Sequence, residues 1–145
     1  MNKKYNSARN VILVVTAITV LNIALVAFGS DTMFLFSASI PYYCLWMTLE
    51  FGYILEAVIA LVAIFVLLAS WLLSKDRILG LVLAIGYFVI DALYLLWLVD
   101  FEIGFITGEL IFHAIIIAYL AYALFLFPKG KSAEDELLSE NTETK

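Results

Sequence analysis

Residues 78–99 read ILGLVLAIGYFVIDALYLLWLV, and Asp91 is the only charged side chain in this stretch. A helix of this length rises about 33 Å at about 1.5 Å per residue, which is enough to cross a hydrocarbon core of about 30 Å. The stretch therefore predicts a membrane-spanning helix that carries a carboxylate inside it.

Three further apolar runs of similar length occur, at residues 10–28, 49–73 and 104–127. Of the 145 residues, 65% are hydrophobic and only 14% are charged, and the mean hydropathy is +1.05. A soluble domain of this size cannot bury that much apolar surface away from water. The apolar runs also lack the short alternating pattern that is typical of a transmembrane β-barrel. The sequence predicts an all-α integral membrane protein, an antiparallel bundle of four transmembrane helices, with the lipid bilayer as its main partner.

The basic residues fall into three groups, at 3–9, 75–77 and 129–145, and the other two connections contain no Lys or Arg. The positive-inside rule then predicts that both termini are cytoplasmic and that the protein is a multi-pass protein of the cell membrane. Residues 1–30 are also typical of a cleavable signal peptide, but the apolar run is longer than a usual signal core, so we favour a retained span.

The connection at 30–48, SDTMFLFSASIPYYCLWMT, is rich in aromatic residues. We expect an interfacial loop that either anchors at the bilayer surface or folds over the bundle as a lid. Ser39 and Pro41 are suited to a helix start, and we expect a bend or break between Thr48 and Gly52. Residues 1–128 are predicted to form one membrane domain, and 129–145 an acidic, disordered cytoplasmic tail.

Polar side chains occur on all four predicted spans at a similar depth. Counting about 1.5 Å per residue from the nearest basic residue places them about 20–30 Å from the cytoplasmic end. These are Asn22, Glu56, Asp91, Glu109 and His113. Charges inside a span are costly, so each is a functional hypothesis, and together they predict a pocket in the bundle that opens outward. Tyr53, Tyr87 and Tyr94 lie within one helical turn of Glu56 or Asp91 and are predicted to line it.

Simpler interpretations of the same residues remain open. His113 follows Glu109 by one turn and is able to form a hydrogen-bonded pair with it that only fixes helix rotation. Asp91 is able to accept from Tyr87, Tyr94 or Asn22 as a contact between helices. Either arrangement would be structural.

The charge on the predicted outer side indicates a cation as ligand. That side carries carboxylates and no Lys or Arg, and a cleft of one charge sign concentrates the opposite sign. We therefore predict binding of a proton, a metal ion or an organic amine, in a sensing or transport role. If a divalent metal ion is bound, the candidate ligands are Glu56, Asp91, Glu109 and His113.

Two alternatives stay open. A metal-dependent membrane enzyme would use the carboxylates and His113, although the sequence contains one cysteine, one histidine and no nucleophile motif. A non-catalytic subunit would use its helix faces to bind a second copy or a larger membrane partner. Nothing in the composition suggests nucleic-acid binding.

Overall fold

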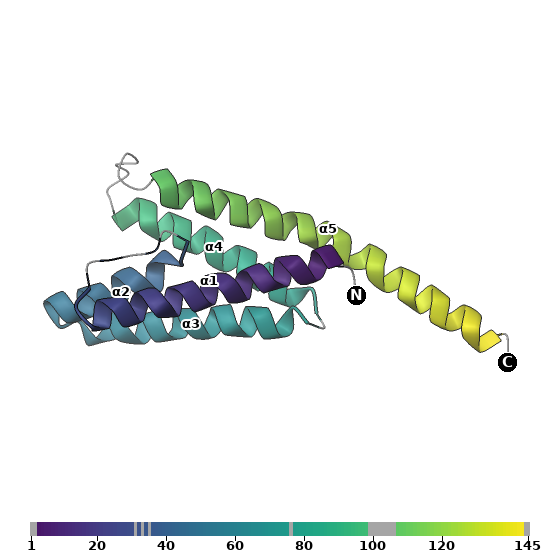
Figure 1. Cartoon of the computed structure of the whole chain (residues 1–145), viewed down its shortest axis with the longest axis horizontal. Helices are drawn as coiled ribbons and strands as arrows, with labels where there is room; N and C mark the ends of the chain where they lie inside the picture. The colour runs from purple at the N-terminus through teal and green to yellow at the C-terminus, as the bar shows by residue number, and fades with distance from the viewer. Residues whose placement is uncertain are drawn as a thin grey trace.

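The structure is a computed structural model that describes residues 3–30, 32, 34, 36–75, 77–98 and 107–143. Its regular elements, within these residues, are helices. They are α1 (Lys3–Ala27), α2 (Ser39–Phe51), α3 (Ile54–Leu73), α4 (Leu79–Leu98) and α5 (Thr107–Glu143). Figure 1 shows the long helices lying side by side along one axis.

Four of these helices contain segments that are long and apolar enough to cross a membrane, as predicted. The segments are Tyr5–Ala27, Ile54–Leu73, Leu79–Leu98 and Thr107–Phe125, and each is 19 to 23 residues long. Large apolar side chains such as Phe65, Ile90 and Phe125 are exposed on the outside of the bundle. Such an apolar surface is compatible with lipid, because the hydrocarbon core of a bilayer offers no hydrogen-bond partners.

The two ends of the bundle differ in charge. We call one the basic end, because Arg9 in α1 and Lys75 and Arg77 in the turn after α3 lie there. Arg9 donates from Nε to the carbonyl of Trp71 at 3.3 Å, and its guanidinium lies 5.2 Å from the Trp71 ring. These contacts tie α1 to α3. We call the opposite end, which carries Glu50 and Glu56, the acidic end.

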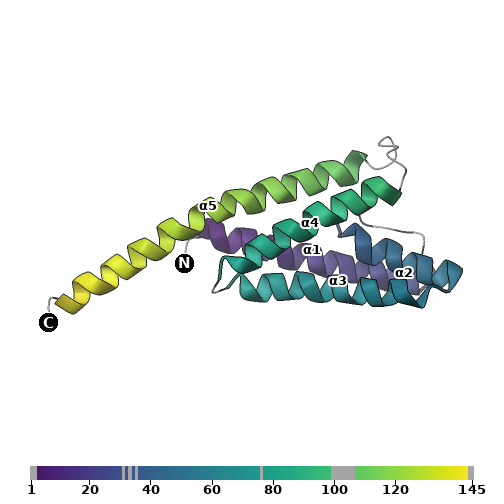
Figure 2. The same ribbon diagram turned by 180° about the vertical axis from the view of Figure 1, so that it is seen from behind.

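The connection between α1 and α3 differs from the interfacial loop that the sequence predicts. Residues 37–41 are buried, and α2 begins among them inside the bundle. From there α2 runs toward the acidic end and packs beside α3, which returns in the opposite direction (Figures 1 and 2). The chain therefore leaves α1, turns back into the bundle, and emerges again as α2. Apolar and small residues in this segment permit its burial.

The predicted break in the second apolar run is present. α2 ends at Phe51 and α3 begins at Ile54. Gly52 adopts φ 73°, and its N–H donates to the carbonyl of Thr48 at 2.9 Å. Because this left-handed conformation strains residues with a Cβ, glycine ends α2 here and permits the tight reversal into α3.

The sequence predicts that the C-terminal segment is disordered or at most a short helix, and this stays a prediction. α5 continues as a helix to Glu143, and Figure 1 shows it extending past the other helices. Nine of residues 129–143 are Glu, Lys, Leu or Ala, which favour helix. The division into domains at residue 128 stays a prediction.

Candidate acid–base network inside the bundle

Asp91 of α4 binds the N-terminus of α2. Its Oδ2 accepts from the N–H of Ser39 at 2.7 Å, and its Oδ1 accepts from the N–H of Ile40 at 2.6 Å. The residue in the N-cap position is Ala38, which has no side-chain oxygen to cap these groups. Asp91 therefore performs from another helix the capping that the local sequence lacks, and the positive end of the α2 dipole favours its negative charge.

His113 of α5 completes this contact from the other side. Its Nε2 lies 2.6 Å from Asp91 Oδ2, and its Nδ1 lies 2.6 Å from the backbone carbonyl of Glu109. Both side chains are at most 1% exposed. One carboxylate thus joins α2, α4 and α5 at a single buried point.

The partners of the two ring nitrogens assign the protons. A carbonyl oxygen can only accept, so Nδ1 of His113 carries a proton. The 2.6 Å separation from Nε2 to Oδ2 requires one further proton between them. Asp91 also accepts two backbone N–H groups. The pair therefore shares one proton and is neutral as a whole.

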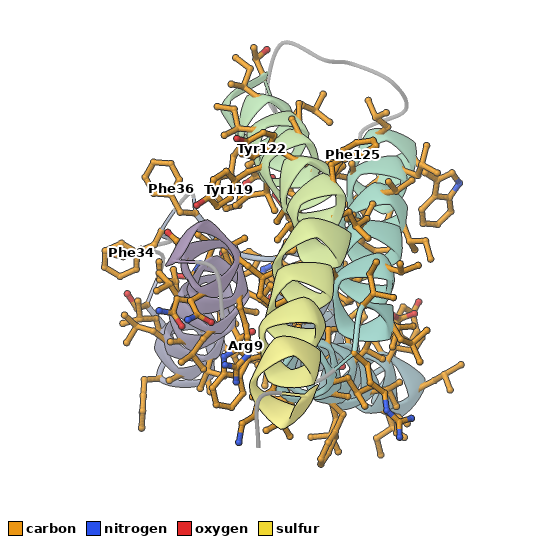
Figure 3. All side chains as sticks on the ribbon, turned by 90° about the vertical axis from the view of Figure 1, so that its right-hand side faces the viewer. Arg9, Phe34, Phe36, Tyr119, Tyr122 and Phe125 are labelled. Atoms are coloured by element: carbon orange, nitrogen blue, oxygen red, sulfur yellow. The ribbon has the colours of Figure 1, made fainter. Side chains whose placement is uncertain are left out.

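A second group of polar side chains, on α1, holds the chain just before α2. Asn22 donates from Nδ2 to the carbonyl of Phe34 at 2.8 Å and to Ser37 Oγ at 2.7 Å, and its Oδ1 accepts from the Phe34 N–H at 2.9 Å. Thr19 Oγ1 accepts from the N–H of Ala38 at 2.9 Å. Figure 3 shows the ring of Phe34 pointing away from the helices, so only its backbone faces α1. The buried backbone of the inserted segment is satisfied in this way.

Glu109 and Tyr87 contribute buried polar atoms that lack a partner among the described residues. Glu109 Oε2 and Tyr87 Oη are both buried without a hydrogen bond. Burial and the nearby charge of Glu109 raise the pKa of Tyr43 to about 12, so Glu109 lies near Tyr43 of α2. The predicted side-chain bond between Glu109 and His113 is not formed, because His113 binds the Glu109 backbone and Asp91 instead.

Tyr53 and Tyr94 are not hydrogen-bonded to Asp91 or His113 within the part of the chain that the structure describes. Tyr53 is 58% exposed at the start of α3. Tyr94 Oη lies 3.8 Å from the thiol of Cys44, and burial together with the nearby carboxylate of Glu56 raises the pKa of that thiol to about 12. Glu56 therefore lies near Cys44, as Asp91 does. Asp91 and Asn22 bind the chain around residues 34–40, and His113 joins this contact through Asp91.

The described residues do not group three His, Cys, Asp or Glu side chains in a way that could hold a metal ion. The reason lies in the existing partners. The oxygens of Asp91 and both nitrogens of His113 already bind protein atoms. Metal binding at the four predicted ligands would require these bonds to break.

Sequence reasoning missed four residues of the network: Thr19, Ser37, Ser39 and Ile40. Thr19 was visible as a polar residue three positions before Asn22 in an apolar span. Ser39 and Ile40 take part through backbone N–H groups, which every sequence position carries, so side-chain patterns could not reveal them. The signal that could have found them is the missing local cap at Ala38 before Ser39 and Pro41.

Comparison with known proteins adds no family to these observations. No protein-family model, no curated protein and no solved structure matches this chain. The inference of function therefore rests on the geometry of the four spans, the inserted α2, and the contact between Asp91 and His113.

Proposed function

We propose that this small multi-pass membrane protein binds a proton at Asp91 and His113, and that proton occupancy controls the position of α2. The single observation that supports it most is the 2.6 Å contact between the two side chains, with Asp91 also holding two N–H groups of α2. In this proposal the protein lies in the cell membrane with the acidic end outward and both termini cytoplasmic, following its basic residues.

Among the three cations that the sequence suggests, the proton fits this contact best. A proton needs only two polar atoms about 2.6 Å apart, and these are present. A metal ion needs several ligands, and the described residues supply no such group. An organic amine would need space beside the carboxylate, but the oxygens of Asp91 face backbone N–H groups and His113.

In this proposal, proton occupancy affects α2 through the charge on Asp91. With one shared proton the pair is neutral, and Asp91 keeps the charge that holds the N-terminus of α2. A further proton on Asp91 would remove that charge and convert an oxygen that accepts into one that donates. Loss of the shared proton would leave a buried carboxylate facing an unprotonated nitrogen, which is unfavourable in a low dielectric. Either change weakens the hold on α2.

Glu109 is placed to exchange protons with this pair. It lies one turn from His113 toward the acidic end, is 7% exposed, and its Oε2 has no partner among the described residues. A buried carboxylate without a donor is costly when charged, so it favours uptake of a proton. We propose that protons reach the pair from the acidic end through Glu109.

The arrangement supports sensing more than transport. Fully buried apolar residues fill the bundle on the way to the basic end, among them Ile12, Leu67 and Leu120. The buried hydroxyls of Thr16 and Ser70 donate to carbonyls of their own helices. Such a core does not provide the continuous polar route that proton transfer across the membrane would need.

Hydrogen exchange of the segment 34–44 would test the proposal. Exchange would be measured in lipid nanodiscs between about pH 4 and about pH 9, which brackets the ordinary pKa values of Asp and His, and corrected with the unfolded peptide. We expect protection to be highest where the pair holds one proton and to fall when it gains or loses one. Asp91→Asn should remove this dependence, whereas Glu56→Gln should keep it. Equal protection at every pH in the native protein would refute the proposal.

A further inference from the structure

A groove opens at the acidic end, away from the network of Asp91 and His113. It has a volume of about 390 Å³ and lies between the end of α1 and one face of α2. Its lining consists of Val26, Ala27, Gly29, Ser30, Tyr42, Trp46, Leu49 and Glu50. None of these residues was among the predicted pocket residues, and its size is in the range of small-molecule sites.

Two aromatic rings and a carboxylate follow one another along the α2 side of this groove. Tyr42, Trp46 and Glu50 are spaced by four residues, which places them in one row on the helix. Trp46 is 42% exposed and Glu50 is exposed, so both are accessible from outside the protein. Aromatic faces attract cations through their quadrupole, and the carboxylate attracts them by charge.

The opposite wall has the same electrostatic preference. It is the C-terminal end of α1, where the helix dipole is negative and favours a cation. Figure 2 shows the end of α1 beside α2 at this end of the bundle. From residue 10 to residue 74 the sequence contains no Lys or Arg, so these helices supply no cation of their own to neutralise Glu50.

We propose that this groove binds a quaternary organic ammonium group. A compact, weakly hydrated cation with alkyl substituents gains from the aromatic rings as well as from Glu50, whereas an inorganic ion gains mainly from charge. The ammonium belongs either to a phospholipid headgroup or to a free amine. The site shares no residue with the proton-binding contact, and so it does not depend on the proposed function.

Binding of tetramethylammonium to the full-length protein would test the free-amine source. The protein would be placed in nanodiscs of phosphatidylglycerol, which carries no ammonium, and binding followed by calorimetry. Trp46→Leu and Glu50→Gln should each weaken binding at least about fivefold, the effect of losing about 1 kcal/mol of cation–π or ionic contact. Matched controls are Trp97→Leu, an exposed tryptophan on α4, and Glu56→Gln, an acid outside the groove; both should bind like the native protein.

Native mass spectrometry would test the headgroup source with the same variants. The protein would be released from equal mixtures of phosphatidylcholine and phosphatidylglycerol. Preferential retention of phosphatidylcholine that is lost in Trp46→Leu and Glu50→Gln assigns the lipid as the ligand, whereas an effect in calorimetry alone assigns a free amine. If neither measurement responds to the groove variants, or if the controls respond equally, the proposal is wrong. Circular dichroism would confirm that each variant keeps its helices.

Discussion

Asp91 and His113 lie on different helices, 22 residues apart in the sequence, and share a 2.6 Å hydrogen bond at a point fully enclosed by protein. The same carboxylate holds two N–H groups at the start of α2. One buried pair therefore connects α5 and α4 to the start of a helix that enters the bundle without spanning it. Breaking a buried pair by removing one partner is strongly unfavourable, because the other charge loses its counter-charge.

Replacement of His113 tests the energetic role of the pair. We expect His113→Ala to lower the free energy of unfolding by about 3–5 kcal/mol, since it leaves Asp91 charged and buried. Asp91→Asn combined with His113→Ala should cost less than the sum of the single changes by about 1 kcal/mol or more. Denaturant unfolding in detergent micelles would measure both values. Additive effects would mean that the two side chains act independently.

Asn22 is expected to hold the inserted segment through its contacts with Phe34 and Ser37. Asn22→Leu removes three hydrogen bonds and leaves the Phe34 N–H without its protein partner, while the Phe34 carbonyl keeps Ser37 Oγ at 3.2 Å. The expected loss is about 1–3 kcal/mol, with faster hydrogen exchange confined to residues around 34–40. Ser7→Ala, which removes an exposed hydrogen bond to Tyr119, is the control and should change neither quantity. An equal loss of protection across all the helices would argue against a local role.

Cys44 reports whether α2 is inserted, and it needs no engineering because it is the only cysteine. It is 1% exposed, and burial together with Glu56 raises the pKa of its thiol to about 12. The thiolate is the reactive form, so the folded protein should react with maleimide at pH 7.5 at least about a hundredfold more slowly than the unfolded chain, whose thiol has a pKa of about 8.5. Equally fast labelling of both states would place α2 on the surface.

Two glycines of α4 give a matched test of how α3 and α4 pack. A Cβ on Gly80 would collide with the backbone of Ser74 and Ser70, whereas a Cβ on Gly86 would meet open space. Gly80→Ala should therefore destabilise the turn between α3 and α4 by more than about 2 kcal/mol. Gly86→Ala should be neutral or stabilise by up to about 1 kcal/mol, because alanine favours helix. Thermal unfolding in detergent would compare the two, and similar melting temperatures would contradict the packing.

The four spans could be predicted from the sequence because length and hydropathy alone determine them, and the break at Gly52 could be predicted from helix length. The insertion of α2 could not. Residues 30–48 are apolar enough for the surface or for the interior, and the choice depends on Asn22, Thr19 and Asp91 satisfying the backbone of the inserted chain. Those bonds depend on how α1 and α4 are rotated, which hydropathy does not specify.

The candidate site, like the fold, could be predicted from the sequence only in part. Counting residues placed Asp91 and His113 at one depth, yet it equally suggested Glu109 and Tyr87 as their partners. The actual partners include two backbone N–H groups of α2, which sequence patterns do not distinguish. Glu56 lies at a comparable depth and near Cys44, and its membership of the same group stays a prediction.

The most direct test of the central claim is the protonation of His113 in the folded protein at neutral pH. His113 is the only histidine, so labelling with ¹⁵N-histidine places the signal on this one ring. We predict that both ring nitrogens carry directly bonded protons in lipid nanodiscs, and that Asp91→Asn removes the proton on Nε2. A ring with a bare Nε2 in the native protein, unchanged by Asp91→Asn, would contradict the shared proton and the coupling to α2.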